Sequence, residues 1–133
     1  MGRFGGFFIM ITTRPRCVAL CAALLTFVPM AAAQAAEWGT IAFSPSTWAT
    51  GWTANKVNEV DAELGALNNC SQYADDCITA INFHDACAAV AVGDNRGWGA
   101  DWGYDDADAQ FKAIDRCSAY DSGCEILRWQ CSW

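Results

Sequence analysis

The chain carries one sequence pattern twice, and this duplication limits the folds open to it. Each half holds two tryptophans four residues apart, then a helical stretch, then two cysteines seven residues apart: Trp48, Trp52, Cys70 and Cys77, and again Trp98, Trp102, Cys117 and Cys124. A pattern that recurs in sequence is expected to recur as a structural unit. The sequence therefore predicts a single domain with two internal repeats, at about residues 37–84 and 87–133.

The first 35 residues have the features of a secretory signal peptide. A positively charged region, an apolar stretch and a small-residue cleavage site follow one another: Arg14 and Arg16, residues 17–30 (CVALCAALLTFVPM), and Ala33-Gln34-Ala35. The apolar stretch is shorter than the ~20 residues of a membrane-spanning helix. We therefore expect secretion to the medium, periplasm or cell envelope, with no membrane span after cleavage. A start at Met10 would give a signal of more usual form, which makes residues 1–9 a candidate over-extension.

The domain expected after cleavage, residues 36–133, is strongly acidic. It keeps five of the eight basic residues and all fifteen acidic ones, which gives a formal net charge of −10. Such a surface repels nucleic acid and anionic membranes. The charge therefore argues against both as partners and favours solubility or a cationic partner.

Six cysteines remain after loss of the signal peptide: Cys70, Cys77, Cys87, Cys117, Cys124 and Cys131. An even number in a short exported chain indicates three disulfides, each contributing about 2–4 kcal/mol. Cys124 and Cys131 bracket a predicted strand that would hold them about 23 Å apart, too far to bond. Cys70 and Cys77 instead join a helix end to the next strand across a short loop, and Cys117 and Cys124 repeat that arrangement. The predicted disulfides are therefore Cys70–Cys77, Cys117–Cys124 and Cys87–Cys131.

The order of the predicted elements is strand, strand, helix, strand, twice over. Strands are predicted at residues 38–44, 48–54, 78–83, 87–92, 98–103 and 125–130, and helices start near Asn58 and Asp105. Each helix shows an apolar stripe at helical spacing: Val57, Val60, Leu64 and Leu67 in the first, and Ala107, Phe111 and Ile114 in the second. The predicted fold is α+β: a duplicated ββαβ unit with a mostly antiparallel sheet and two helices packed on one face.

The four paired tryptophans, Trp48, Trp52, Trp98 and Trp102, are the candidate binding residues. Residues four apart in a strand share a face, so each pair is expected on one side of its hairpin. Exposed tryptophans can stack on sugar rings or anchor a protein partner. They can equally pack across the hairpins as the main apolar mass of a small domain. Their recurrence at matched places favours packing over binding.

His84 is the only histidine, and it stands beside Asp85. Such a pair can act as a general base and its orienting group. No serine lies in a G-x-S-x-G nucleophile motif, however, and a polar pair at a strand end is an ordinary structural feature. The sequence therefore predicts no catalytic residue and no enzymatic activity.

Acidic residues and cysteines could bind a metal, but both also have structural explanations. Acidic residues gather around the start of the second helix, at Asp94, Asp101, Asp105, Asp106 and Asp108. Calcium favours such oxygen ligands, but the EF-hand spacing is absent and helix capping explains the same residues. Zinc sites normally place cysteines closer together and use histidine more often. No metal and no cofactor is therefore predicted, with calcium at Asp101–Asp108 left open.

The mature chain resembles a bacterial family of small exported proteins, domain of unknown function 4189. The resemblance covers nearly all of residues 37–133 and rests on four segments: Trp38–Ser44 (WGTIAFS), Ala62–Cys70, Cys87–Val92 (CAAVAV) and Trp129–Cys131. It implies secretion and internal disulfides, with no established activity, cofactor or catalytic residue to transfer. It also suggests, by analogy, action at the boundary with a host or competitor.

Three functional hypotheses follow. The leading one is a small secreted, non-enzymatic binding protein whose partner is an unknown protein or envelope component. The alternatives are a small secreted hydrolase that uses His84 and nearby acids, and a structural component of the envelope.

Overall fold

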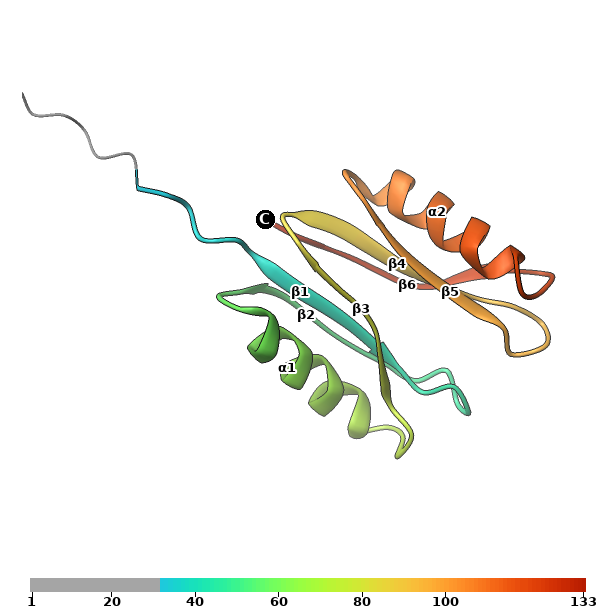
Figure 1. Cartoon of the computed structure of the whole chain (residues 1–133). Helices are drawn as coiled ribbons and strands as arrows, with labels where there is room; N and C mark the ends of the chain where they lie inside the picture. The colour runs from blue at the N-terminus through green and yellow to red at the C-terminus, as the bar shows by residue number, and fades with distance from the viewer. Residues whose placement is uncertain (1–31) are drawn as a thin grey trace, which may run out of the picture. The chain divides into compact units, whose positions relative to one another are not determined.

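The computed structural model describes residues 32–133 (Figure 1), so almost all of the predicted signal peptide lies outside the described residues. The elements in chain order are β1 (Trp38–Phe43), β2 (Thr50–Lys56), α1 (Glu59–Ser71), β3 (Ile78–His84), β4 (Ala86–Val92), β5 (Trp98–Gly103), α2 (Asp106–Ser118) and β6 (Glu125–Ser132). This order is ββαβ twice, which confirms the predicted α+β fold and its duplication.

The strands form two sheets, each from one half of the chain. Their orders are β2-β1-β3 and β5-β4-β6, and all of the pairings are antiparallel. The outer strands of each sheet therefore run parallel to one another, and the helix between them crosses the central strand. α1 packs on the first sheet and α2 on the second. The expectation of two helices on one face of one sheet is thus wrong.

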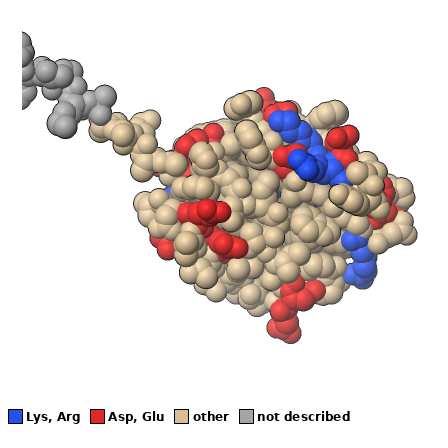
Figure 2. Space-filling view, in the orientation of Figure 1, with Lys and Arg blue, Asp and Glu red and all other residues tan. Residues whose placement is uncertain are grey.

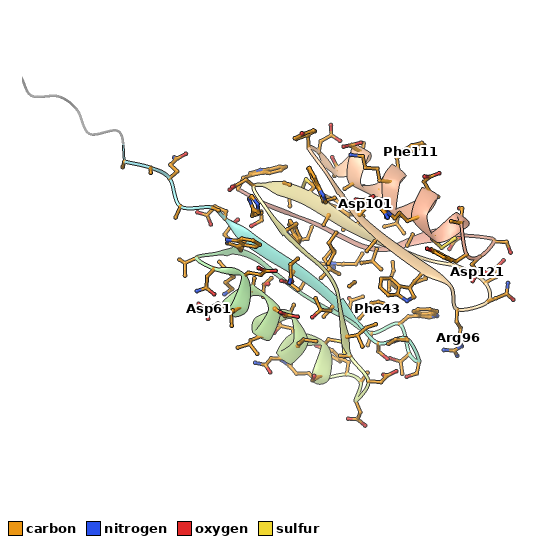
Figure 3. The ribbon with its side chains drawn as sticks, viewed as in Figure 1. Phe43, Asp61, Arg96, Asp101, Phe111 and Asp121 are labelled. Atoms are coloured by element: carbon orange, nitrogen blue, oxygen red, sulfur yellow. A yellow bond between two sulfur atoms is a disulfide. The ribbon has the colours of Figure 1, made fainter. Side chains whose placement is uncertain are left out.

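The central strands explain why two sheets form instead of one. β1 and β4 are buried almost throughout, so both of their faces need a cover. On one face, Ile41 and Phe43 of β1 pack against Ala88 and Val90 of β4, which joins the two sheets. Phe43 is labelled in Figure 3. On the other face, each central strand packs against the helix of its own half. The layers therefore run α1, first sheet, second sheet, α2.

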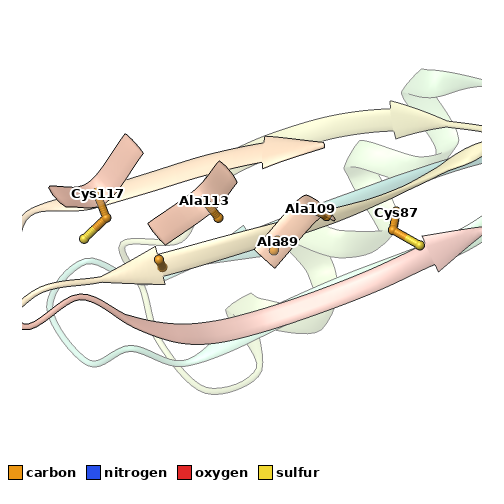
Figure 4. Packing of buried hydrophobic residues seen from close by; sticks show 6 residues of the cluster. Cys87, Ala89, Ala109, Ala113 and Cys117 are labelled. Atoms are coloured by element: carbon orange, nitrogen blue, oxygen red, sulfur yellow. The ribbon is translucent and has the colours of Figure 1, made fainter. Parts of the chain in front are cut away.

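The helices pack through small residues, and most residues of the predicted apolar stripes are exposed; in the first stripe only Leu67 is partly buried against the core. The buried positions repeat every four residues: Ala62, Ala66 and Cys70 in α1, and Ala109, Ala113 and Cys117 in α2 (Figure 4). By contrast, Val60 is 63% exposed, Leu64 55% and Phe111 73%. The physical reason is close approach, because a Cβ on Gly51 or Gly99 would collide with the backbone of the facing helix. A leucine has no room at such a contact.

The paired tryptophans do not occupy equivalent places in the two halves. Gly51 pairs with Ala42 and approaches Cys70, while Gly99 pairs with Ala91 and approaches Cys117, so these two glycines are equivalent. The equivalent glycines are 48 residues apart, whereas Trp52 and Trp102 are 50 apart, so the tryptophans are displaced by two residues relative to the structural repeat. An offset of two keeps a side chain on the same face of a strand, and Trp52 and Trp102 accordingly both lie on the face away from the helix.

The three disulfides join the pairs expected from the sequence: Cys70–Cys77, Cys87–Cys131 and Cys117–Cys124. The second bridge links directly paired positions of β4 and β6. The other two each close a loop between a helix and the next strand, and each of these loops carries an aspartate that binds the hairpin turn of its own half.

These two aspartates fix the turns by accepting hydrogen bonds. Asp76 accepts from the Ser44 hydroxyl and, at 3.1 Å, from the backbone N–H of Ser46. Asp121 accepts from the backbone N–H groups of Asn95 at 2.8 Å and Gly97 at 2.7 Å. The hydrogen bond from the Ser44 side chain lowers the pKa of Asp76 most, and that from the Asn95 side chain does the same for the pKa of Asp121.

Acid should therefore destabilise the domain through these two turns. A lowered folded-state pKa gives stability that is present above the ordinary pKa of aspartate and is lost as the pH falls through the lowered value. Urea unfolding from pH 7 to pH 2 should show a steeper loss below pH 4 in the wild type than in the Asp76→Asn/Asp121→Asn variant. Asp75→Asn, in the same loop as Asp76, is the matched control. Equal pH profiles for the wild type and the double variant would contradict the assignment.

Candidate binding cleft

The structure divides the four tryptophan candidates into two kinds. Trp48 and Trp98 are half-buried and pack on Phe43, with ring centroids 6.0 Å and 5.0 Å from its own. They belong to the core between the sheets, as the packing interpretation expects. Trp52 and Trp102 are 39% and 45% exposed. These two are the more exposed of the four and offer the most free surface to a ligand.

Trp52 already has a cation from within the chain. The guanidinium of Arg128, from β6, lies 4.6 Å from the centroid of the Trp52 ring. The Nε of that arginine is buried without a hydrogen-bond partner, and burial lowers the pKa of Arg128. This contact links β2 to β6, the edge strands of the two sheets, and gives Trp52 a structural role.

Trp102 lines a cleft of about 490 Å³. The lining comes from the start of β1, the end of β3, the start of β4 and the end of β5 and its following residue: Trp38, Asn82, Phe83, His84, Asp85, Ala86, Trp102 and Tyr104. The cleft thus lies where elements of both halves meet, and no short stretch of sequence contains it.

Pairing between strands places the aromatic rings of the cleft. Trp38 pairs with His84 across β1 and β3, and their ring centroids lie 4.7 Å apart. The rings of Trp102 and Tyr104 meet edge to face, with centroids 5.7 Å apart and planes 86° apart. Tyr104 is 80% exposed, so its ring contributes little to the core. Two ring pairs thus flank one opening.

Asp85 is fixed at the cleft by its own backbone. It is the single residue between β3 and β4, and its φ of 48° lies in the left-handed region, which aspartate tolerates better than most residues. Its N–H donates to the Glu37 carbonyl at 3.1 Å, and its Oδ1 accepts from the Glu37 N–H at 2.9 Å. The bond from Glu37 lowers the pKa of Asp85 most, followed by that from His84, so the carboxylate is charged at neutral pH.

His84 lies in this cleft, with its Nδ1 3.1 Å from Oδ2 of Asp85. The neighbouring pair found in the sequence is therefore also a pair in space. None of the residues that line the cleft is a serine, threonine or cysteine, and none is a lysine or arginine. What the cleft offers is aromatic surface, one imidazole, one amide and one carboxylate.

Three of the acidic residues considered for calcium, Asp101, Asp105 and Asp108, have partners within the chain. Asp105 is the N-cap of α2 and accepts from the Asp108 N–H at 2.8 Å. Asp108 pairs with Lys112 at 2.8 Å, and Asp101 with Arg116 at 2.8 Å. Within residues 32–133, no group of three or more acidic, histidine or cysteine side chains is arranged to hold a metal ion. These residues thus cap and anchor α2.

The electrostatic surroundings of the cleft follow the composition of the domain. On the face drawn in Figure 2, acidic side chains appear in several separate groups. Lys112 of α2 approaches a ring of the cleft: its Nζ lies 5.5 Å from the Trp102 ring centroid and is paired with Asp108. The bond to Asp108 raises the pKa of Lys112. Its charge is therefore matched locally by a carboxylate.

Reasoning from the sequence identified Trp102 and His84 but missed Trp38 and Tyr104. The missed residues stand at strand ends, where an aromatic side chain carries no motif. The predicted absence of a membrane span concerns the whole mature chain. Among the described residues, no helix has the length and apolar character needed to cross a membrane.

Comparison with known proteins points to one family. The family model of the domain of unknown function DUF4189 matches residues 38–131. No curated protein matches the sequence. Among solved structures, the chain is similar to the NMR structure of Rv1813c from Mycobacterium tuberculosis, at 20% sequence identity and a TM-score of 0.49 over 98% of this chain and 96% of that one.

Proposed function

The chain belongs to the DUF4189 family, and we propose that it is a small exported, non-enzymatic binding protein that uses the aromatic cleft as its site. One observation carries this proposal: exposed rings of Trp102 and Tyr104 converge with Trp38 and the fixed carboxylate of Asp85 on one opening. Keeping aromatic rings in contact with water costs free energy that packing would recover. Exposed rings beside a fixed polar group are typical of binding sites.

Export is supported by two independent features. The N-terminal sequence has the pattern of a secretory signal peptide. The described domain holds three disulfides, which persist in oxidising compartments outside the cytoplasm. The proposed place of action is therefore the cell envelope or its exterior, with a ligand from the envelope, a host or a competing cell.

The test is a fragment screen by NMR on the oxidised, exported protein labelled with ¹⁵N. The library should contain cationic, neutral and anionic fragments in equal numbers. We expect saturable shifts of the Trp38 and Trp102 indole N–H signals for at least one class, and loss of these shifts in Trp102→Ala. Trp52→Ala is the matched control, because Trp52 is similarly exposed but lies outside the cleft. Fragments that bind only elsewhere, or none that bind, would count against the cleft.

The hydrolase alternative draws on one observation, the contact between His84 and Asp85 within the cleft. Such a pair could activate a water molecule. We favour binding because no side-chain nucleophile of the serine, threonine or cysteine type lines the cleft with it. Turnover of a bound ligand by the wild type, with its loss in His84→Gln, would establish the alternative.

A further inference from the structure

The ligand class of the cleft can be argued from its rings. The faces of Trp102 and Tyr104 are nearly perpendicular, so they form two walls of a corner. A cation placed in such a corner is attracted by the negative faces of both rings. Trp38, with its ring against His84, adds a third aromatic side chain to the same opening. Several ring faces around one space are the usual means of holding an ammonium group that has no N–H to donate.

Other tryptophans of this chain show that their rings hold cations. Arg96 lies over Trp48 with its guanidinium carbon 5.9 Å from the ring centroid, and Arg128 lies over Trp52. The chain thus uses the same attraction twice to join its two halves. Lys112 lies over the Trp102 ring in the same way, but its ammonium group is already paired with Asp108. The cleft-lining residues themselves include no lysine or arginine, and their one imidazole, that of His84, contacts Asp85.

The negative charge of Asp85 and of the surrounding domain also favours a cationic ligand. Asp85 is held in place by both backbone groups of Glu37, and its carboxylate lines the cleft. The domain around it carries a net charge of −10, from five basic and fifteen acidic residues in residues 36–133. An acidic surface concentrates cations and repels anions near its clefts. An anionic ligand would be repelled both by the negative charge of the whole domain and by the Asp85 carboxylate.

From these observations we infer that the cleft binds a small soluble organic cation with a methylated ammonium group. This inference rests on the proposed function and names its ligand class. The methylated ammonium would lie against the rings of Trp102 and Tyr104, with Asp85 supplying the opposite charge. The cleft volume of about 490 Å³ is ample for a molecule of this size.

The experiment compares choline with 3,3-dimethylbutan-1-ol, in which carbon replaces the charged nitrogen and the shape is kept. Titrations of the oxidised, exported protein at pH 8 should be followed by NMR, with binding located by the indole signals. We expect saturable binding of choline in the cleft and about tenfold weaker binding of the neutral compound. Trp102→Ala should weaken choline binding about tenfold, and Asp85→Asn severalfold.

Trp52→Ala controls for a general effect of removing an exposed tryptophan and should bind choline like the wild type. If Trp102→Ala fails to fold, Tyr104→Ala, at the most exposed ring of the cleft, takes its place and should show a similar loss. Equal binding of choline and its neutral analogue would overturn the assignment of a cation. Binding to phosphatidylcholine vesicles without binding of free choline would overturn the assignment of a soluble ligand.

Failure of this inference is distinguishable from failure of the proposed function. If neutral or anionic fragments shift the Trp38 and Trp102 signals and choline does not, the cleft remains a binding site and only the ligand class is wrong. If no fragment of any class perturbs those signals, both proposals fail together.

Discussion

Gly51→Ala and Gly99→Ala are each expected to lower the free energy of unfolding by about 3 kcal/mol or more. A Cβ at position 51 would collide with the Ala66 carbonyl oxygen and the Cys70 nitrogen, and one at position 99 with the Cys117 nitrogen. These are backbone atoms of a helix, which cannot rotate aside as a side chain can. The helix would have to move off its sheet and lose the contacts of its buried alanines. Urea unfolding of the oxidised protein, followed by tryptophan fluorescence, measures the change.

Gly65→Ala is the control for this prediction. A Cβ there would meet the methyl group of the Thr53 side chain and not a backbone atom. Alanine also favours a helix over glycine by about 1 kcal/mol, which offsets part of the steric cost. We therefore expect a much smaller loss for this variant. If Gly51→Ala and Gly99→Ala both cost less than about 1 kcal/mol, the helices do not lie as close to the sheets as described.

Removing the Cys87–Cys131 disulfide is expected to cost about 4 kcal/mol, more than the loss of either other bridge. It joins residues 44 apart in the chain, whereas the other two join residues 7 apart. Chain entropy alone predicts about 2.5 kcal/mol for a loop of the shorter kind. Cys87 is fully buried, as Cys70 and Cys117 are, so each variant loses packing and the loop length sets the order. Urea unfolding of Cys87→Ala/Cys131→Ala, with the two other bridges verified by intact mass, measures the effect.

The comparison variant is Cys70→Ala/Cys77→Ala. Its expected loss of stability is smaller, but this loss should be larger at neutral pH if freeing the loop also releases Asp76 from the β1–β2 turn. A loss as large as that of the Cys87–Cys131 variant would mean that the loop aspartates contribute more than chain entropy. Comparing the stability losses of the two variants therefore separates the contribution of chain entropy from that of the loop aspartates.

Local signals predicted the elements and the pairing of the cysteines well. The polar residue before each helix does cap it: Asn58 accepts from the Asp61 N–H at the start of α1, and Asp105 accepts from the Asp108 N–H at the start of α2. The disulfides could be assigned because two of them span only a short loop. These features depend on a few neighbouring residues, which is the range over which sequence patterns are informative.

The helix faces could not be predicted because two stripes competed. Val60 and Leu64 form one, and Ala62 and Ala66 form the other. Hydrophobicity favours the larger residues, but the distance between helix and sheet favours the smaller ones. That distance is set by Gly51 in a different element, so it appears only when strand and helix are brought together. The split into two sheets has the same origin, because it depends on pairing between distant strands.

The cleft was partly anticipated and partly missed for a related reason. Trp102 was a candidate because it belongs to a repeated pattern, and His84 because it is the only histidine. Trp38 and Tyr104 belong to neither of the repeated tryptophan pairs and become neighbours only through the pairing of β1 with β3 and the course of β5. The two-residue offset of the tryptophans also means that the first half has no tryptophan at the position equivalent to Trp102, so the repeated sequence pattern does not create a second cleft of this kind. Sequence symmetry therefore guided the fold more reliably than the site.

The order of layers bears on how a chain of this kind arises. Each half covers the outer face of its sheet with its own helix, while the inner face, which carries Ile41 and Phe43 in one half, packs on the other half. A lone ββαβ unit would bury that face by pairing with a copy of itself about a twofold axis. Duplication and fusion of its gene would place both subunits of such a homodimer in one polypeptide. Each subunit then evolves independently, and an asymmetric site can form at what was a symmetric interface.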